Sequence, residues 1–215
     1  MMKLKKLLLA SATVLSVSAV HADVVGVIDP AGWDRGDTDS GYLEFDVFTA
    51  VVSTGNAASG SGGMTGTLDA TVTDGILIGA PTDNRIYDGG NNSVYDIAAS
   101  ATSFDINFLL LQIKENAGAG IASPYSVTLD GVAASSTSIF DDGNGHSITS
   151  FYWDLGTTIT AGTSFNLSVD NFVGFQHDSI DSFSIDASAS AIPVPAAAWL
   201  FGSALLGLGV VRRKN

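Results

Sequence analysis

The sequence predicts an all-β fold, an antiparallel β-sandwich of the jelly-roll kind, and three observations support this class. Short segments between residues 42 and 187 alternate apolar and polar side chains, which is the period of a half-buried strand. Clusters of Gly, Asn, Asp and Ser, which supply turn conformations, separate these segments. No part of the body carries a sustained helical stripe, so about eight strands at this spacing favour two packed antiparallel sheets.

Nine segments are expected to be strands. The most apolar of them spans residues 103–114 and carries large apolar side chains on both faces, so we expect it near the middle of the sandwich. The stretch GNAASGSGGMTG, residues 55–66, is of low complexity and is expected to form a mobile loop. The expected strands are residues 42–52, 64–72, 76–79, 94–98, 103–114, 125–132, 147–155, 163–169 and 180–187.

The length and the charge of the chain limit its class. Its 215 residues suffice for one ordinary domain, which we place at residues 23–191. This body holds three basic residues, Arg35, Arg85 and Lys114, against all 22 acidic ones, a formal charge of −19. Such a body repels phosphate backbones and anionic headgroups, which argues against nucleic-acid binding. The chain has no cysteine, so disulfides and cysteine nucleophiles are excluded.

The first 22 residues have the three-part pattern of a secretory signal peptide. A basic start is followed by an apolar stretch over residues 7–20 and by Val20 and Ala22 at the positions that a signal peptidase reads. We expect cleavage after Ala22. A buried N-terminal helix is the alternative interpretation.

The chain ends in an apolar segment followed by positive charge. Residues 196–211 are uncharged and mostly apolar, and as a helix they would extend over about 24 Å. Because a bilayer core is about 30 Å thick, residues 192–195 would have to complete the crossing. Arg212, Arg213 and Lys214 then mark the cytoplasmic side. The sequence therefore predicts a transmembrane helix over residues 196–211.

Residues 192–215 resemble the PEP-CTERM sorting signal of bacterial envelope proteins. The motif Pro193-Val194-Pro195 precedes the apolar helix and the basic end in the family's order, with Val194 where the family has glutamate. The resemblance implies recognition by an exosortase, a membrane-embedded cysteine protease, and an association with exopolysaccharide production. A permanent single-pass anchor is the alternative.

Calcium is the only cofactor that the sequence suggests. Asp34, Asp37 and Asp39 precede the first expected strand, and closely spaced carboxylates are the hard oxygen ligands that calcium prefers. The full EF-hand loop is missing, and an exposed polar turn is the alternative. The acidic, glycine-rich stretch 139–148 is predicted to be a hairpin turn, with calcium binding again the alternative.

The sequence offers little for catalysis. His146 and His177 are the only histidines after the signal peptide, and neither lies in a catalytic motif. Glu115 follows an expected strand and is interpreted as a solvated strand end. Asp178 and Asp181 precede the last expected strand and are expected to face either a ligand or water. We therefore predict that the protein is not an enzyme.

Two adjacent aromatic residues are candidates for sugar binding. Tyr152 and Trp153 lie on one expected strand, so their side chains point to opposite faces. An exposed ring there would stack on a sugar, whereas core packing is the interpretation we favour for Trp153.

These observations predict an exported structural or adhesive protein of the cell surface or extracellular matrix. It would carry a signal peptide (1–22), a sandwich body (23–191) and a sorting tail (192–215), and its helix would lie in the inner membrane before processing by an exosortase-type protease. A calcium-assisted carbohydrate-binding module, with exopolysaccharide as its partner, is the second hypothesis. A secreted hydrolase is the third.

Overall fold

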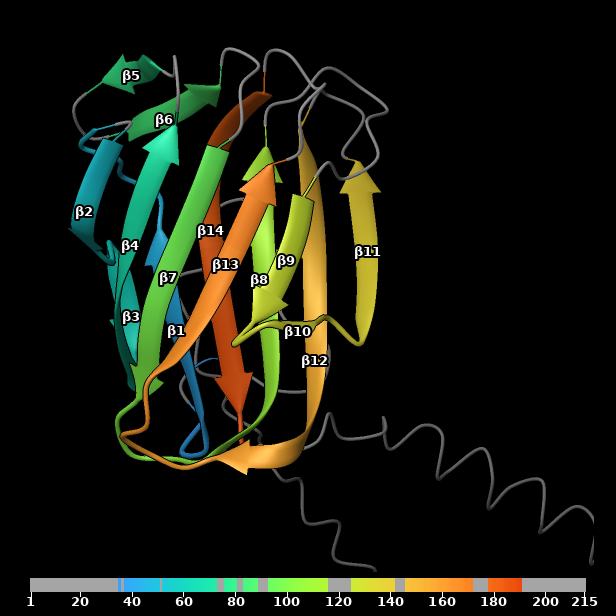
Figure 1. Ribbon diagram of the computed structural model, residues 1–215. Helices are drawn as coiled ribbons and strands as arrows, with labels where there is room; N and C mark the ends of the chain where they lie inside the picture. Colours follow the sequence, from blue (N-terminus) through green and yellow to red (C-terminus); the bar gives the residue numbers. More distant parts are fainter. Residues whose placement is uncertain are drawn as a thin grey trace, which may run out of the picture.

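The computed structural model describes residues 35, 37–50, 52–72, 76–80, 83–88, 93–115, 125–141, 146–171 and 178–190. These residues form strands and turns (Figure 1), and they include no helix long and apolar enough to cross a membrane. The expected signal peptide, the sorting tail and Asp34 lie outside the described residues.

The described strands form two sheets, and every strand pair in them is antiparallel. The first sheet contains β1 (Ser40–Phe45), β3 (Gly60–Gly62), β5 (Ile76–Ala80), β6 (Asp83–Asp88), β8 (Ile106–Glu115), β11 (Ser136–Asp141), β12 (Ser147–Ile159) and β14 (Asp178–Ser188). The second contains β2 (Val52–Ala57), β4 (Met64–Val72), β7 (Ser93–Ala101), β9 (Tyr125–Leu129), β10 (Val132–Ala133) and β13 (Phe165–Asn171). This arrangement confirms the predicted all-β sandwich.

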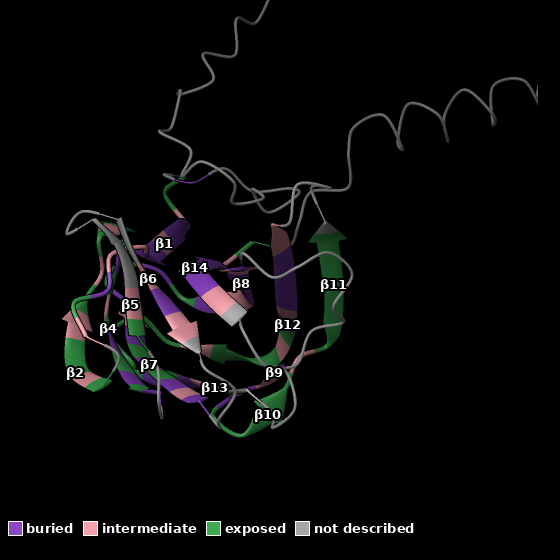
Figure 2. Cartoon of the chain, turned by 90° about the horizontal axis from the view of Figure 1, so that it is seen from above, coloured by how far each residue is buried: buried purple, intermediate pink, exposed green. Residues whose placement is uncertain are grey.

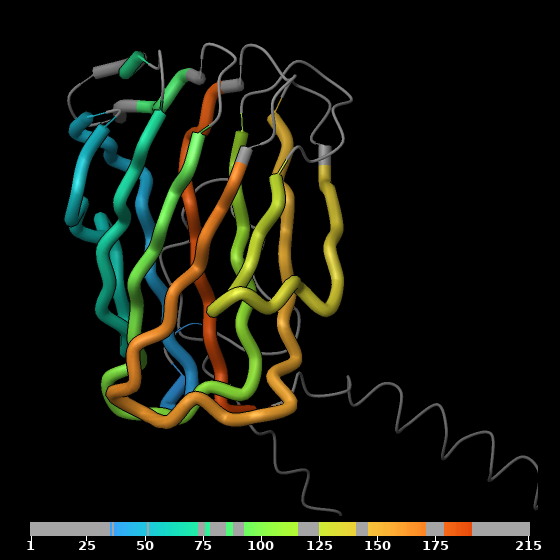
Figure 3. The backbone as a smooth tube through the Cα atoms, in the orientation of Figure 1, coloured from blue at the N-terminus to red at the C-terminus, as the bar shows by residue number. Residues whose placement is uncertain are grey.

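The order of the strands sets which segments meet. The first sheet runs β11-β12-β8-β14-β1-β3, with β6 beside the start of β14 and β5 beside β6. The second runs β10-β9-β13-β7-β4-β2. The chain passes from one sheet to the other between β7 and β8 and between β12 and β13, where the end of β12 curves across the sandwich (Figure 3).

The core lies between the two sheets because strand alternation sends every second side chain inward. Burial is concentrated on the inner strands, whereas β2, β10 and β11 are exposed (Figure 2). Phe183 of β14 contacts Tyr95 of β7 with ring centroids 5.0 Å apart, and its ring also meets Phe48 edge-on at 6.2 Å. These contacts join the two sheets through aromatic packing.

β8 occupies the central place that its sequence predicts, between β12 and β14. Leu109, Leu111 and Ile113 point into the core, and Leu110 on the outer face is buried as well. The strand begins at Ile106. Ile106 and Leu109 are three residues apart and both lie in the core, so the alternation between inward and outward side chains shifts by one residue between them.

The prediction of a mobile loop at residues 55–66 is wrong. This stretch contains the second half of β2, all of β3 and the start of β4. Both glycines of β3 pack closely: a Cβ at Gly60 would lie 2.7 Å from Oε2 of Glu44, and one at Gly62 would lie 2.6 Å from Cε1 of Tyr42. The low complexity therefore reflects tight contacts with β1 rather than flexibility.

Two further boundaries differ from the prediction. The first strand ends at Phe45 instead of residue 52, and Phe48 beyond it is buried in the core. Ile139 and Phe140 belong to β11, which pairs with β12 as the predicted hairpin requires, whereas residues 142–145 lie outside the described residues.

A pair of glycine substitutions tests this packing. Gly41→Ala is expected to lower the free energy of unfolding by about 1–3 kcal/mol, since its Cβ would lie 2.8 Å from Gly62 O, Met64 Cγ and Phe104 Cε1. Gly156→Ala is the matched control, because nothing lies within 4 Å of its added Cβ. Urea unfolding of both variants measures the difference. Equal effects at the two positions would contradict the close packing of β1 against β3.

Candidate functional site: a cleft at the side of the sandwich

The cleft forms because β12 is longer than its partner. β11 pairs with residues 147–152 of β12, and β12 continues to residue 159 without it. The register between β12 and β8 shifts between Asp154 and Ile159, which is the mark of a bulge. Residues 155–158 therefore leave the regular ladder and open the side of the sandwich.

The opposite wall is a tight turn between β9 and β10. Asp130 and Gly131 have φ values of 48° and 81°, which the primed hairpin turns require and which Asp-Gly sequences supply. The backbone N–H of Asp130 donates to Asn166 O at 2.8 Å, and the N–H of Asn166 donates to Asp130 Oδ1 at 2.9 Å. β13 thus holds this wall in place.

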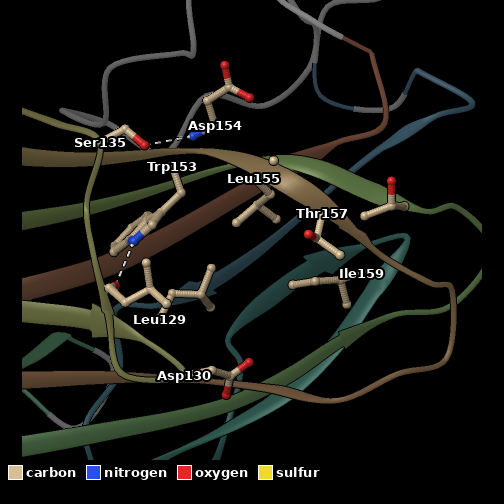
Figure 4. A pocket seen from close by; sticks show the side chains of 11 residues that line it. Leu129, Asp130, Ser135, Trp153, Asp154, Leu155, Thr157 and Ile159 are labelled. Atoms are coloured by element: carbon tan, nitrogen blue, oxygen red, sulfur yellow. Dashed lines mark hydrogen bonds between the residues drawn. The ribbon is translucent and has the colours of Figure 1, made fainter.

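The cleft has a volume of about 420 Å³ and a largely apolar interior. Trp153, Leu155 and Ile159 lie on the side of β12 that faces Leu129, whereas Asp154 points away from them (Figure 4). The indole Nε1 of Trp153 donates to Val132 O at 3.0 Å, which ties β12 to β10. The lining residues are Leu129, Asp130, Val132, Ser135, Trp153, Asp154, Leu155, Gly156, Thr157, Thr158 and Ile159.

These residues are suited to holding a small ligand. An apolar interior with a few hydroxyl and carboxylate groups at its margin is typical of small-ligand sites. The lining residues supply the hydroxyl groups of Ser135, Thr157 and Thr158 and the carboxylates of Asp130 and Asp154. The cleft can hold a ligand that has both an apolar face and hydroxyl groups.

The two adjacent aromatic residues have different surroundings. Trp153 is 1% exposed, which confirms its predicted place in the core and leaves no ring face for stacking on a sugar. Tyr152 lies on the outer face, half-buried, and stacks on Phe108 with ring centroids 6.3 Å apart. Burial, and then the charge of Asp154, raises the pKa of the Tyr152 hydroxyl.

A buried charge cluster lies on the outer face of the first sheet and consists of Arg35, Tyr42, Glu44, Ser184 and Asp186. The Arg35 guanidinium donates from Nε and Nη2 to the two oxygens of Asp186, at 2.6 and 2.8 Å. It also donates to Ser184 Oγ at 2.5 Å and to Glu44 Oε1, and it lies 4.9 Å from the centre of the Tyr42 ring.

The electrostatics of this cluster are dominated by burial and by the single cation. Burial alone would lower the pKa of Arg35, but hydrogen bonds and attraction from Asp186 and Glu44 outweigh it, and the pKa is raised. For Glu44 the balance differs. Burial raises the pKa of its carboxyl more than Arg35 lowers it, and the charges of Asp186 and Asp46 raise it further.

This raised pKa sets an expected pH dependence. The pKa of the Glu44 carboxyl is higher in the folded state than in the unfolded state. The stability that this carboxyl contributes by binding its proton more tightly in the folded state is therefore fully present at pH values below the unfolded-state pKa. It is lost as pH rises through the folded-state pKa. Wild type should therefore gain stability relative to Glu44→Gln as pH falls from 7 into the acidic range. Urea unfolding at several pH values measures this difference. If wild type instead loses stability relative to Glu44→Gln on acidification, then the attraction of Arg35 lowers the pKa of Glu44 more than burial raises it.

A second charged group joins Asp181 of β14 to Arg85 of β6 and to His146, which precedes β12. Asp181 is buried, with Oδ1 3.2 Å from Nε of Arg85 and Oδ2 3.7 Å from Nδ1 of His146. The structure thus turns Asp181 towards protein partners instead of a ligand or water. The interpretation of Glu115 as a solvated strand end is also wrong, since it is 2% exposed and lies opposite Ile180.

The predicted calcium ligands are only partly described. Asp37 is exposed, and its carbonyl oxygen accepts from the Ser40 N–H at 3.2 Å. Asp39 accepts from the Ala189 N–H through its carbonyl and from the Ser190 hydroxyl through its carboxylate. Among the residues that the structure describes, no three His, Asp or Glu side chains form a group suited to a metal ion. Since Asp34 is not described, the three-aspartate calcium set stays a prediction.

Comparisons with protein-family models, with curated proteins and with solved structures found no match to this chain. The candidate site therefore rests on its own residues. Sequence reasoning missed the cleft because the β9–β10 turn and β12 meet only in the folded chain. The Asp130-Gly131 dipeptide was the available signal, since it marks a two-residue hairpin turn.

Proposed function

We propose that the protein is a non-catalytic, exported component of the cell surface or extracellular matrix, with a structural or adhesive role. The observation that carries this proposal is the tail, in which Pro193-Val194-Pro195 precedes an apolar segment and Arg212 to Lys214. The signal-like residues 1–22 and the acidic, cysteine-free body support it. An exosortase-type protease would read the tail, and the body would be left outside the membrane.

The connectivity of the body accords with a jelly-roll-like sandwich, which we include in the proposal. Strands distant in sequence pair repeatedly, as β1 does with β14 and β7 with β13. Such long-range pairing is typical of Greek-key and jelly-roll proteins that serve as binding or structural modules.

The intact mass of the native protein tests the proposal. The protein would be recovered separately from the membranes and from the medium or surface of its own host. A species that begins at Asp23 and ends near Pro195 is the expected result. A membrane species that retains Arg212 to Lys214 would indicate a permanent anchor and overturn processing by an exosortase, while a species that still begins at Met1 would overturn export.

The cleft favours a second candidate function, the binding of a carbohydrate. Its apolar interior matches the carbon face of a sugar ring, and Asp130, Ser135 and Thr157 at its margin offer partners for hydroxyl groups. Because Trp153 is buried, such binding would depend on the margin and on Leu155 and Ile159 rather than on stacking. Calcium assistance would come from Asp34, Asp37 and Asp39, of which Asp37 and Asp39 are described and directly precede β1.

Titration with polysaccharides, including the polymer of the host, tests the binding function. Calorimetry should detect binding by wild type and a large loss of affinity for Thr157→Trp, which fills the cleft. Thr67→Trp, at an exposed position of β4, is the matched control and should bind normally. Equal affinities for the two variants would exclude the cleft, and an unchanged thermal unfolding temperature in millimolar calcium would remove the metal from the proposal.

A further inference from the structure

Natural sheets protect their edges, and three edge strands of this sandwich follow that practice. β3 has only three residues and β10 only two. β2 is broken by a register shift between Ser53 and Asn56 and by Gly55, whose φ is 69°. Short length and bulges prevent each of these strands from pairing with another chain.

β11 lacks this protection. It is six residues long and pairs with β12 in one unbroken register from Ser136 to Asp141. Residues 136–140 are all exposed, and they include no charge, proline or glycine. Ile139 is 46% exposed and Phe140 is 51% exposed, and they are two of the five large apolar side chains that are exposed among the described residues. An uncharged, regular and apolar edge is a template for a further strand.

We propose that β11 pairs with β11 of a second copy of this chain, antiparallel and about a two-fold axis. Such pairing is self-complementary, because alternate residues of β11 direct their N–H and C=O groups towards the open side. With the axis passing through Ser138, Thr137 lies opposite the partner copy's Ile139. The first sheets of two molecules would then join into one continuous sheet.

The charge of the molecule favours a second copy over a foreign partner. A foreign partner attracted to this acidic chain, which has a net charge of −13, would be basic. Such a partner would bind best where carboxylates of this chain lie beside the strand on which it docks. β11 offers one carboxylate, Asp141, at its end. The strand is instead an uncharged stretch where two acidic molecules can meet without opposing like charges. Added salt should strengthen the association, because it screens repulsion between the bodies.

Self-association through β11 requires only the sandwich, so it holds whether or not the chain is exported or its cleft binds a sugar. The test uses the full chain in mild detergent, with sedimentation velocity over a range of concentrations. Wild type should dimerise, and Ile139→Glu and Phe140→Glu should weaken the dimer at least about tenfold by placing like charges across the two-fold axis. Thr67→Glu adds the same charge at an exposed position of β4 and should leave the affinity unchanged.

A second measurement locates the interface without disrupting it. Since the chain has no cysteine, Ser138→Cys accepts a single nitroxide label, and Thr67→Cys serves as its control. The distance between labels in the dimer should be clearly shorter at position 138. A monomer at every concentration, or a dimer that persists in Ile139→Glu and Phe140→Glu, would overturn the proposal. Loss of the dimer in Ile76→Glu, with the dimer retained in Ile139→Glu and Phe140→Glu, would also overturn the proposal, because it would place the interface at β5.

Discussion

Replacing Arg35 by methionine is expected to lower the free energy of unfolding by about 3–5 kcal/mol. The change removes the cation of the buried charge cluster and leaves the buried carboxylates of Glu44 and Asp186 without their ion pairs to this guanidinium. Surface ion pairs contribute far less, commonly under about 1 kcal/mol, so the expected size of the effect depends on burial. Thermal and urea unfolding of the two proteins measure it.

Two controls separate burial from net charge. Thr67→Glu makes the same change in net charge on the exposed surface and should change stability by less than about 0.5 kcal/mol. The triple variant Arg35→Met, Glu44→Gln, Asp186→Asn should regain much of the loss, because no buried charge is left unpaired. If Arg35→Met has the same free energy of unfolding as wild type, the ion pairs between the guanidinium and the two carboxylates do not stabilise the protein in solution.

Replacing Trp153 by alanine is expected to cost about 3–5 kcal/mol of unfolding free energy. The side chain is the largest of the fully buried side chains among the residues that the structure describes, and its loss opens a cavity beside the cleft. The substitution also removes the hydrogen bond from Nε1 to Val132 O, which links the two sheets. Urea unfolding measures the loss, and the backbone amide signal of Val132 reports on the link.

The matched variants for this position are Trp153→Phe and Phe140→Ala. Trp153→Phe retains most of the packing. Its free energy of unfolding should fall by about 1 kcal/mol more than the loss of side-chain volume alone would cause, because the Val132 carbonyl loses its hydrogen-bond donor. Phe140→Ala truncates an aromatic side chain that is 51% exposed and should change stability by less than about 0.5 kcal/mol. Similar losses at positions 153 and 140 would contradict the place of Trp153 in the core.

The fold class and its central strand follow from the sequence because alternation and burial are linked. β8 and β12 carry apolar side chains at the spacing of strands, and turn residues separate them from their neighbours. β2 and β3 could not be predicted in this way. Their glycines and small residues resemble a linker in composition, and for β3 the contacts of Gly60 with Glu44 and of Gly62 with Tyr42 distinguish the strand from a linker.

The candidate site was less predictable than the fold because its residues meet across long sequence distances. Arg35 binds Asp186, which lies 151 residues away, and no local spacing encodes such a pair. One signal was present: the body has three cations among 22 acidic residues, so each cation is a natural partner for a buried carboxylate. Arg35 and Arg85 both fulfil that role.

The buried charge cluster also determines how the sandwich responds to mechanical load. Ser40 at the start of β1 lies opposite Ser188 at the end of β14, so the sandwich is entered and left at the same end. A force that pulls these two ends apart would unzip β1 from β14 one rung at a time instead of shearing all rungs together. The contacts between Asp39 and Ala189 and between Arg35 and Asp186 lie at that end, so they would bear the load first.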